Sequence, residues 1–171
     1  MALTSDQLLD RLDALGIATR TIEHPPLFTV EDSKRLRGDL PGGHVKNLFL
    51  RDKRGRFWLL VTLEDQHVNL KALAKHLAVG RFSFANAQQL EHHLGITPGA
   101  VSPLAVINDT ARAVTVLIDD VLLQKDPVHL HPLRNDRTTA IAPHDLVRFL
   151  EACGHAPQIV TLAAFAADAP A

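Results

Sequence analysis

The sequence has little cysteine, few aromatic residues and no excess of either charge. Its one cysteine, Cys153, excludes an internal disulfide and a cysteine-rich zinc site. Lysine and arginine number 18 against 19 acidic residues, so the formal net charge is −1. That balance argues against a protein that coats nucleic acid through a strongly basic surface. No apolar run approaches the roughly 18 residues of a transmembrane helix, so none is predicted.

The N-terminal segment 1–6 lacks a basic run followed by an apolar core, so we expect no signal peptide. Together with the single cysteine, this predicts a protein of the reducing cytoplasm. A length of 171 residues and a hydrophobic content of 46% indicate one folded domain. We place that domain over residues 1–162, and we expect the alanine-rich tail 163–171 to be frayed.

Helix signals and strand-length apolar runs are interspersed along the chain. Helices are predicted after the capping residues Thr4, Thr29, Asn69 and Asn86, and from Pro143. Strands are predicted at 45–50 and 57–63 as one hairpin, at 104–107 and 114–118 as a second hairpin, and at 17–23, 138–141 and 159–162, with 124–137 mostly irregular. Strict β-α-β alternation is absent, which predicts a single-domain α+β fold with a mixed, mostly antiparallel sheet flanked by helices.

Motifs of the common enzyme classes are missing. The sequence has no Gly-x-Ser-x-Gly elbow, no phosphate-binding glycine loop and no carboxylates paired for acid/base chemistry. Ten histidines invite a metal hypothesis, but the closest pairs, His92-His93 and His129-x-His131, have no further ligands at metal spacing. We therefore expect neither a metal nor a cofactor. Cys153, near a helix C-terminus, is expected to be a buried apolar residue.

Three segments are unusual for pure scaffolding. Segment 42–47 brings Lys46 and Asn47 from a glycine loop to the start of an apolar strand, where a lysine either anchors a ligand or protects a sheet edge. Segment 97–103 is stiffened by two prolines and either presents main-chain groups to a substrate or only connects two elements. Segment 129–139 is polar and irregular, as functional loops often are.

Together these segments resemble the YbaK/prolyl-tRNA-synthetase-associated editing family, and more closely its free-standing alanyl-tRNA(Pro) deacylase branch. The likeness runs from about His24 to Pro157. It rests on the shared order and spacing of short stretches at 43–53, 68–73, 81–84, 94–103, 107–109, 131–135 with Thr138-Thr139, and 154–157.

The resemblance implies hydrolysis of the ester between a wrong amino acid and the terminal adenosine of proline tRNA. Such a second sieve admits a residue smaller than proline, here alanine. Lys46 is implied as the residue most closely tied to activity, anchoring the tRNA 3′ end, and His131 as a positioning group or general base. Substrate-binding roles are implied for Asn47, Gly99, Ala100, Pro103 and Asn108. The implied partners are the alanine-charged acceptor end of tRNA(Pro) and prolyl-tRNA synthetase.

The missing nucleophile agrees with this resemblance. Similar enzymes use an activated water, assisted by the ribose hydroxyl of the substrate, so the protein supplies orientation and electrostatic stabilisation. Despite the neutral total, a local set of basic residues is available to follow the acceptor stem: Lys34, Arg35, Arg37, Lys46 and the basic residues of 51–56.

The sequence also departs from the family pattern. Leu104-Ala-Val106 stands where Phe-Gly-Leu is expected, Leu130 where an aromatic residue often precedes His-Pro, and Ser102 where threonine is usual. If any of these departing residues lines the acyl pocket, the size of that pocket differs from the family pattern, and so does the preference for alanine. Two alternatives therefore stay open: a deacylase for another small residue, cysteine or serine, and a non-catalytic nucleic-acid-binding or regulatory domain of the same fold.

Overall fold

A mixed sheet forms the centre of the molecule. The computed structural model describes residues 1–27, 29–37 and 40–168. Within them the strands are β1 (Thr19–Glu23), β2 (Gly43–Asp52), β3 (Phe57–Leu63), β4 (Phe82–Phe84), β5 (Val114–Asp119), β6 (Val128–Leu130), β7 (Arg137–Ile141) and β8 (Gln158–Val160). Their order is β1-β7-β6-β2-β3-β5-β8, with β4 beside β2. Pairing is parallel for β2–β6, β3–β5 and β5–β8 and antiparallel elsewhere in this sheet, which confirms the predicted arrangement.

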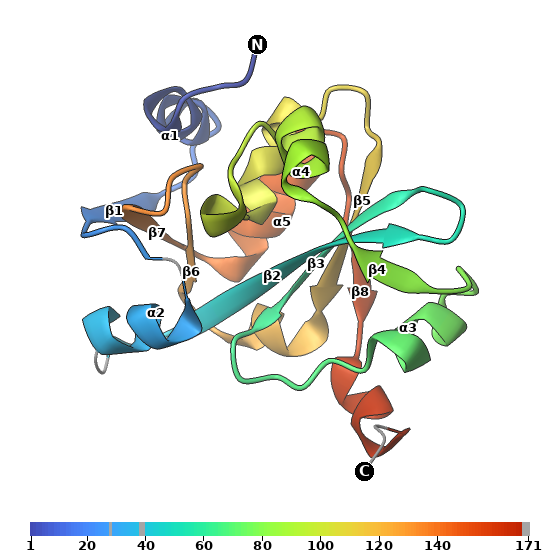
Figure 1. Cartoon of the computed structure of the whole chain (residues 1–171). Helices are drawn as coiled ribbons and strands as arrows, with labels where there is room; N and C mark the ends of the chain where they lie inside the picture. Colours follow the sequence, from blue (N-terminus) through green and yellow to red (C-terminus); the bar gives the residue numbers. More distant parts are fainter. Residues whose placement is uncertain (28, 38–39, 169–171) are drawn as a thin grey trace.

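Helices lie on both faces of this sheet. The described α-helices are α1 (Ser5–Ala14), α2 (Val30–Arg37), α3 (Leu70–His76), α4 (Ala87–Leu94) and α5 (Pro143–Ala152). The 3-10 helices are η1 (Pro98–Ala100), η2 (Pro103–Asn108), η3 (Asp120–Gln124) and η4 (Leu162–Asp168). Figure 1 shows α4 and α5 on one side of the sheet and α3 on the other. The predicted α+β fold is confirmed, and no helix of the described residues is long and apolar enough to cross a membrane.

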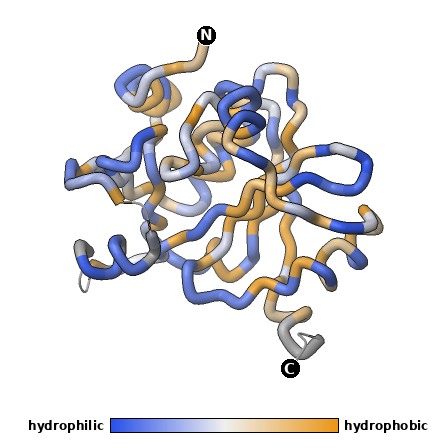
Figure 2. The backbone as a smooth tube through the Cα atoms, viewed as in Figure 1, coloured by the Kyte–Doolittle hydropathy of each residue, from blue (hydrophilic) through white to orange (hydrophobic). Residues whose placement is uncertain are grey.

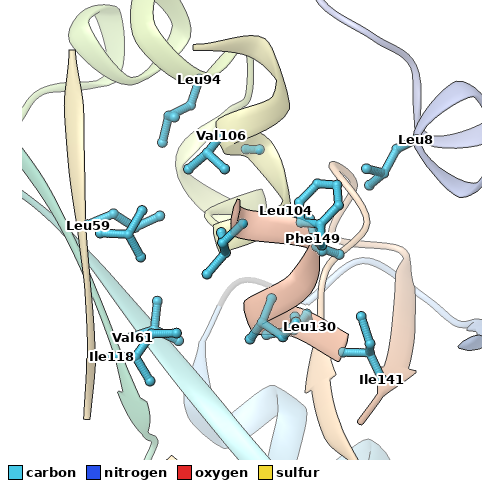
Figure 3. Close-up of a cluster of buried hydrophobic side chains, with 14 of the residues drawn as sticks. Leu8, Leu59, Val61, Leu94, Leu104, Val106, Ile118, Leu130, Ile141 and Phe149 are labelled. Carbon is cyan, nitrogen blue, oxygen red and sulfur yellow. The ribbon is translucent and has the colours of Figure 1, made fainter. Parts of the chain in front are cut away.

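Buried side chains form one cluster on each face of the sheet. On the α4 and α5 side, Leu59 of β3 packs in one cluster with Leu104 of η2 and Phe149 of α5 (Figure 3). On the α3 side, Leu60 of β3 packs in a second cluster with Leu73 of α3. Because both faces of β3 are covered, its sequence is a continuous apolar run, visible as orange tube in Figure 2. Each such fully buried side chain contributes about 1.5–3 kcal/mol.

Strand β2 changes partner along one of its edges. Its other edge pairs with β3 from Val45 to Arg51. On the changing edge, β2 pairs with β6 at Gly43 and His44 and with β4 from Leu50 to Asp52. Between these two pairings, residues 45–49 have no strand partner on that edge among the described residues. The sheet is therefore open there, and side chains and loops have room to approach the strand.

The predicted helix starts agree with the structure. The hydroxyl of Thr4 accepts a hydrogen bond from the Gln7 N–H, and the Gln7 side chain accepts one from the Thr4 N–H. Asn86 and Gln89 form the same reciprocal pair at α4. Asn69 caps α3, Thr29 accepts a bond from the Asp32 N–H at α2, and α5 begins with its proline. These local side-chain bonds satisfy N–H groups that a helix start leaves free, which is why the sequence predicts them well.

The predicted second hairpin is wrong. Residues 104–107 lie in η2, a 3-10 helix that Pro103 opens and that Ser102 caps by accepting the Leu104 N–H at 3.2 Å. Strand β5 instead joins β3 and β8 in parallel. An apolar run of four residues fits a buried strand and a buried helical turn equally well, because both bury every side chain.

Short elements occur in two further segments that the sequence predicts to be mostly irregular or frayed. The segment 124–137 contains β6, and the tail expected to fray from residue 163 continues as η4, with Phe165 packed against the second cluster. The part of the tail at 169–171 lies outside the described residues. Strand β4, which was not predicted, is only three residues long and pairs with the end of β2.

Candidate active site

A cleft lies beside the open stretch of β2. Its walls come from β1 and the turn after it, β2, β6 with the following loop, and η1. The cleft has two lobes that share Leu27, Val45, Asn47, Glu64 and His131. The first lobe adds Ile22, His24, Leu40, His44, His129, Leu130 and Thr138, and the second adds Thr29, Lys46, Pro98, Gly99 and Val101. Two of the unusual sequence segments, 42–47 and 97–103, meet here with the start of the third.

The start of β2 is fixed by a close approach to the chain before β6. Gly42 has a φ of +112°, and a Cβ at this position would lie 2.4 Å from the carbonyl oxygen of Pro127. The N–H of Gly43 donates to the same carbonyl at 2.8 Å. Only glycine provides both the backbone angle and the space. The glycine pair therefore brings the following residues of β2 beside β6, where the cleft forms.

Lys46 lies on β2 opposite Thr62 and is half-buried. Its ammonium donates a hydrogen bond to the carbonyl of Gln66 at 2.5 Å. Burial lowers the pKa of Lys46, because removal of water disfavours the charged form, while the nearby Asp65 carboxylate opposes this shift. The cation is thus held at the cleft wall, where it can bind an anionic group of a ligand.

Asn47, the next residue, has a buried side-chain oxygen with no hydrogen-bond partner among the described residues. Its Nδ2 donates to the carbonyl of Val101 at 3.1 Å. Because a carbonyl only accepts, this contact fixes which end of the amide faces Val101 and leaves Oδ1 on the other side. A buried acceptor without a donor costs about 1–3 kcal/mol. The cleft therefore presents an acceptor that a donor group of a ligand would satisfy.

The main chain of Asn47 also faces the open edge. Across this edge the Gly43 N–H donates to the Pro127 carbonyl, and the Phe49 carbonyl accepts from the Ala85 N–H. Since main-chain groups alternate between the two edges of a strand, those of Asn47 point the same way. The edge-pairing of β2 skips this residue within the described part of the chain. The side chain and the main chain of Asn47 thus both present polar groups to the cleft.

His131 lies directly after β6 and lines both lobes. Its Nδ1 is 2.9 Å from the carbonyl oxygen of Arg137, so Nδ1 carries the hydrogen and donates it. Burial lowers the pKa of His131; the bond to Arg137 raises it, and the neighbouring His24 lowers it further. The ring is therefore neutral near pH 7, and its Nε2 holds a lone pair that can accept a proton or a hydrogen bond.

Three more histidines line the first lobe, although sequence reasoning selected only His131. His44 and His129 stack with ring centroids 4.7 Å apart, and the Nε2 atoms of both bond to main-chain carbonyls of the 40–41 segment. His24 donates from Nδ1 to the Pro25 carbonyl and accepts the Thr138 hydroxyl hydrogen at Nε2, 2.7 Å away. The described residues hold no group of three or more metal-binding side chains. These rings serve as walls of the cleft, and each is fixed by its own hydrogen bonds.

Of the other predicted substrate-binding residues, the structure places one in the cleft and three outside it. Gly99 lies in η1 and lines the second lobe. Ala100 is buried in the first hydrophobic cluster, and Pro103 is buried at the start of η2, so neither lines the cleft. Asn108 is also elsewhere: its Nδ2 donates to the Leu94 carbonyl at 3.0 Å, and its Oδ1 accepts the Leu3 N–H at 2.9 Å. That side chain connects the N-terminus to the end of α4.

Of the departures from the family pattern, one reaches the cleft. Residues 104–106 are fully buried in the core, and Ser102 is buried as the cap of η2. Leu130 is 2% exposed, yet it lines the first lobe beside the histidines. With a leucine here, the wall of the first lobe is a branched aliphatic side chain instead of the flat aromatic ring that the family pattern has. The size of the first lobe thus depends on Leu130 rather than on the changes near η2.

Apart from Lys46, which lies in the cleft, the predicted basic residues fall into two separate groups. On α2, Lys34 pairs with Asp65 at 2.6 Å and Arg35 with Asp32 at 2.6 Å, while the side chain of Arg37 lies outside the described part of the structure. Residues 51–56 form the turn between β2 and β3, at the other end of β2 from the cleft (Figure 1). In this turn Asp52 is buried and accepts bonds from Arg56 and from the Trp58 indole. Arg51, Lys53 and Arg54 are exposed.

Comparison with known proteins finds relatives that match most of the chain, nearly all of the cleft-forming residues included. A family model described as an aminoacyl-tRNA editing domain matches residues 24–149, which include the walls of the cleft except Ile22. The chain is 37% identical over 158 residues to the prolyl-tRNA synthetase associated domain-containing protein 1 of Bos taurus, covering 90% of this chain and 92% of that protein. It is 35% identical over 156 residues to the prolyl-tRNA editing protein ProX of Acetoanaerobium sticklandii, covering 91% and 95%.

Solved structures show the same fold. A crystal structure described as a candidate trans-editing enzyme for prolyl tRNA synthetase superposes with a TM-score of 0.72 at 17% identity, covering 95% of this chain and 98% of that one. The structural likeness concerns the fold, and the sequence match of residues 24–149 carries the family assignment. The chain belongs to the aminoacyl-tRNA editing domain family.

Proposed function

We propose that this protein is a trans-editing deacylase that hydrolyses alanyl-tRNA(Pro). The observation that carries the proposal is the buried Oδ1 of Asn47, which has no hydrogen-bond partner among the described residues, in a cleft that Lys46 and His131 also line. An aminoacyl-tRNA carries groups that these side chains can bind: an α-ammonium donor, an ester carbonyl and the phosphates of the tRNA 3′ end. The names of the relatives, which refer to prolyl-tRNA editing and to the synthetase, support tRNA(Pro) as substrate and prolyl-tRNA synthetase as partner.

The reaction needs a water molecule and no protein nucleophile. The water oxygen bonds to the ester carbonyl carbon, the bond from that carbon to the ribose oxygen breaks, and a water proton ends on the ribose oxygen. The ribose hydroxyl next to the ester assists the water, and neutral His131 positions it or accepts its proton through Nε2. The hydroxyl hydrogen of Thr138 is engaged by His24 and does not supply this proton.

Different parts of the cleft bind different parts of the substrate. The Lys46 ammonium serves as a compact point charge for the tRNA 3′ end, since a lysine offers three donors and full charge. Asn47 Oδ1 accepts from the α-ammonium of the amino acid. The backbone of η1 around Gly99 faces the ester carbonyl from the second lobe. A small acyl group such as alanine suits the first lobe, whose wall His131 and Leu130 narrow.

A deacylation assay tests the proposal. Proline tRNA is charged separately with alanine, cysteine, serine or proline, and the ester remaining is followed over time. We expect fast loss of alanine and sparing of proline, and a fall of about a hundredfold or more in Lys46→Ala, because the tRNA end loses its anchor.

Lys71→Ala removes an exposed lysine of α3 and serves as the matched control, with an unchanged rate expected. Equal rates for wild type and Lys46→Ala would remove Lys46 from the site. Faster loss of cysteine or serine than of alanine would assign the enzyme to another small residue, and no turnover of any charged tRNA would favour a binding module.

A further inference from the structure

A second groove continues from the cleft toward β4. It is lined by residues 47–49 of β2, by 84–87, and by Leu90, Pro98 and Val101. Three of these, Asn47, Pro98 and Val101, also line the second lobe of the cleft. The groove and the cleft are therefore two parts of one path along the open edge of β2.

An exposed aromatic ring stands at the far end of this path. Phe84 is 65% exposed, although the neighbouring Phe82 of the same strand is 8% exposed and packs in the core. Phe84 pairs with Leu50, four residues beyond Lys46 on β2. At ~3.3 Å per residue, the ring lies about 13 Å from Lys46 along the strand. A ring at that distance is too far to contact the acyl group and belongs to a different part of a ligand.

Exposed basic residues lie near Phe84 in the β2–β4 pairing and in the adjoining turn. Arg51 lies opposite Ser83 in the β2–β4 pairing, one position from Phe84 and on the other face of the strand pair, and Arg81 directly precedes β4; both are exposed at this edge of the sheet. The adjoining turn adds Lys53 and Arg54, also exposed, and its one acid, Asp52, is buried and paired with Arg56. Figure 2 shows this turn as a hydrophilic projection beside the apolar strands. An exposed ring next to exposed cations is the combination that binds single-stranded nucleic acid, by stacking and by charge.

We propose that Phe84 forms a stacking subsite for the unpaired nucleotides that precede the terminal adenosine of the tRNA, with Arg51 and Arg81 beside their phosphates. This inference rests on the proposed function, because the esterified adenosine must occupy the cleft for its strand to leave along the groove. The occupant is single-stranded RNA rather than a peptide, since the path begins at the ester and ends among cations. The subsite would increase affinity without taking part in the chemistry.

The test compares Phe84→Ala with Phe84→Trp on two substrates, alanyl-tRNA(Pro) and the alanyl ester of adenosine alone. Loss of one stacked base corresponds to roughly a 5- to 150-fold change in affinity. We expect Phe84→Ala to raise KM for the tRNA by about tenfold with kcat unchanged, and to leave the adenosine ester unaffected. Phe84→Trp should keep the wild-type KM. Ile159→Ala, at a 49% exposed apolar residue of β8, is the matched control and should change nothing.

Binding without chemistry separates this inference from the proposed function. The probe is an uncharged acceptor-stem minihelix with an unpaired 3′ end, labelled for fluorescence anisotropy. We expect weaker binding by Phe84→Ala than by wild type, whether or not the wild type hydrolyses any ester. Equal binding by both proteins overturns the subsite. An equal loss of activity on tRNA and adenosine ester, or a loss seen only with prolyl-tRNA synthetase present, also overturns it in favour of a role in the cleft or in protein docking.

Discussion

At the scale of single residues, Lys46 and Asn47 contribute to one cleft although consecutive strand residues point to opposite faces of a sheet. They do so because the cleft lies at an open strand edge, which both faces border. Asn47 reaches over to the Val101 carbonyl on one side, and Lys46 reaches the Gln66 carbonyl on the other. The adjacent pair thereby places a cation and an acceptor without a partner among the described residues at different walls of the same cleft.

The state of His131 predicts the pH dependence of activity. Burial holds its pKa below the ordinary value of 6.5, so the ring stays neutral down to a pH below about 6.5 and becomes a cation only in more acidic solution. We expect kcat/KM to hold its plateau to lower pH than an imidazole of ordinary pKa would allow, and to fall in more acidic solution as Nε2 becomes protonated. The measurement is a pH–rate profile under single-turnover conditions.

The variant His131→Gln should lower the rate and remove this acidic limb. His144→Ala, at a 77% exposed imidazole on α5, is the control and should preserve the wild-type profile. An acidic limb that persists in His131→Gln would assign the titration to another group.

Sequence reasoning located some of these residues and missed others for a physical reason. Lys46, Asn47 and Gly99 occur in recognisable short stretches, and all three line the second lobe of the cleft, while their roles toward a substrate stay predictions. Asn108 occurs in such a stretch too, yet it serves the N-terminus and α4. His24 and His44 enter the cleft through pairing of β1 with β7 and of β2 with β6, which joins segments about a hundred residues apart. No local pattern encodes such pairing.

At the scale of elements, two of the sequence stretches that carry the family resemblance meet far from the chemistry. Asp109, in the turn before β5, accepts the Ala113 and Val114 N–H groups and a bond of 2.9 Å from His155 Nε2, after α5. Both residues are at least 95% buried. The pair joins the start of β5 to the end of α5, so these stretches specify the fold rather than the site.

Stability should depend on this buried pair. Asp109→Asn leaves His155 without its charged partner, and breaking a buried pair in this way costs about 3–5 kcal/mol of unfolding free energy. Chemical denaturation measures the loss. Asp10→Asn, on the exposed face of α1, is the control and should stay within about 0.5 kcal/mol of wild type.

The same pair fixes how stability changes with pH. Burial raises the pKa of Asp109, but bonds from His155, Val114 and Ala113 outweigh it and hold the pKa below 3.8. The carboxylate therefore contributes stability above about pH 4 and loses that contribution as pH falls through its lowered pKa. Asp109→Asn should flatten this acid-side loss; a loss of equal size in wild type and variant would contradict the assignment.

Helix ends and the first hairpin were predictable because capping bonds and the basic turn act within a few residues. The misplaced second hairpin shows the limit of that locality. Whether 104–107 forms a strand or a 3-10 turn is decided by packing against Phe149 and Leu59, which the local sequence does not contain. The parallel partners of β5 were hidden for the same reason, since β3 and β8 lie far away in the chain.

At the scale of the whole molecule, a net charge of −1 coexists with a basic turn beside the groove. A protein that contacts only the end of a tRNA neutralises few phosphates. We therefore expect log(1/KM) for alanyl-tRNA(Pro) to fall with log salt at a slope of about −3, as for a few phosphate contacts. The adenosine ester should show almost no salt dependence, and a slope near −10 would indicate an extended basic interface instead.

Strand β2 belongs to two halves of the sheet, one reached through β6 and one through β3, and residues 45–49 lie between its pairings with β6 and with β4 on the outer edge. Over that section of β2, pairing with a strand comes from β3 alone among the described residues. That section carries Lys46 and Asn47. We therefore expect a ligand that bonds to Lys46 and Asn47 to stiffen the strand that joins the two halves of the sheet.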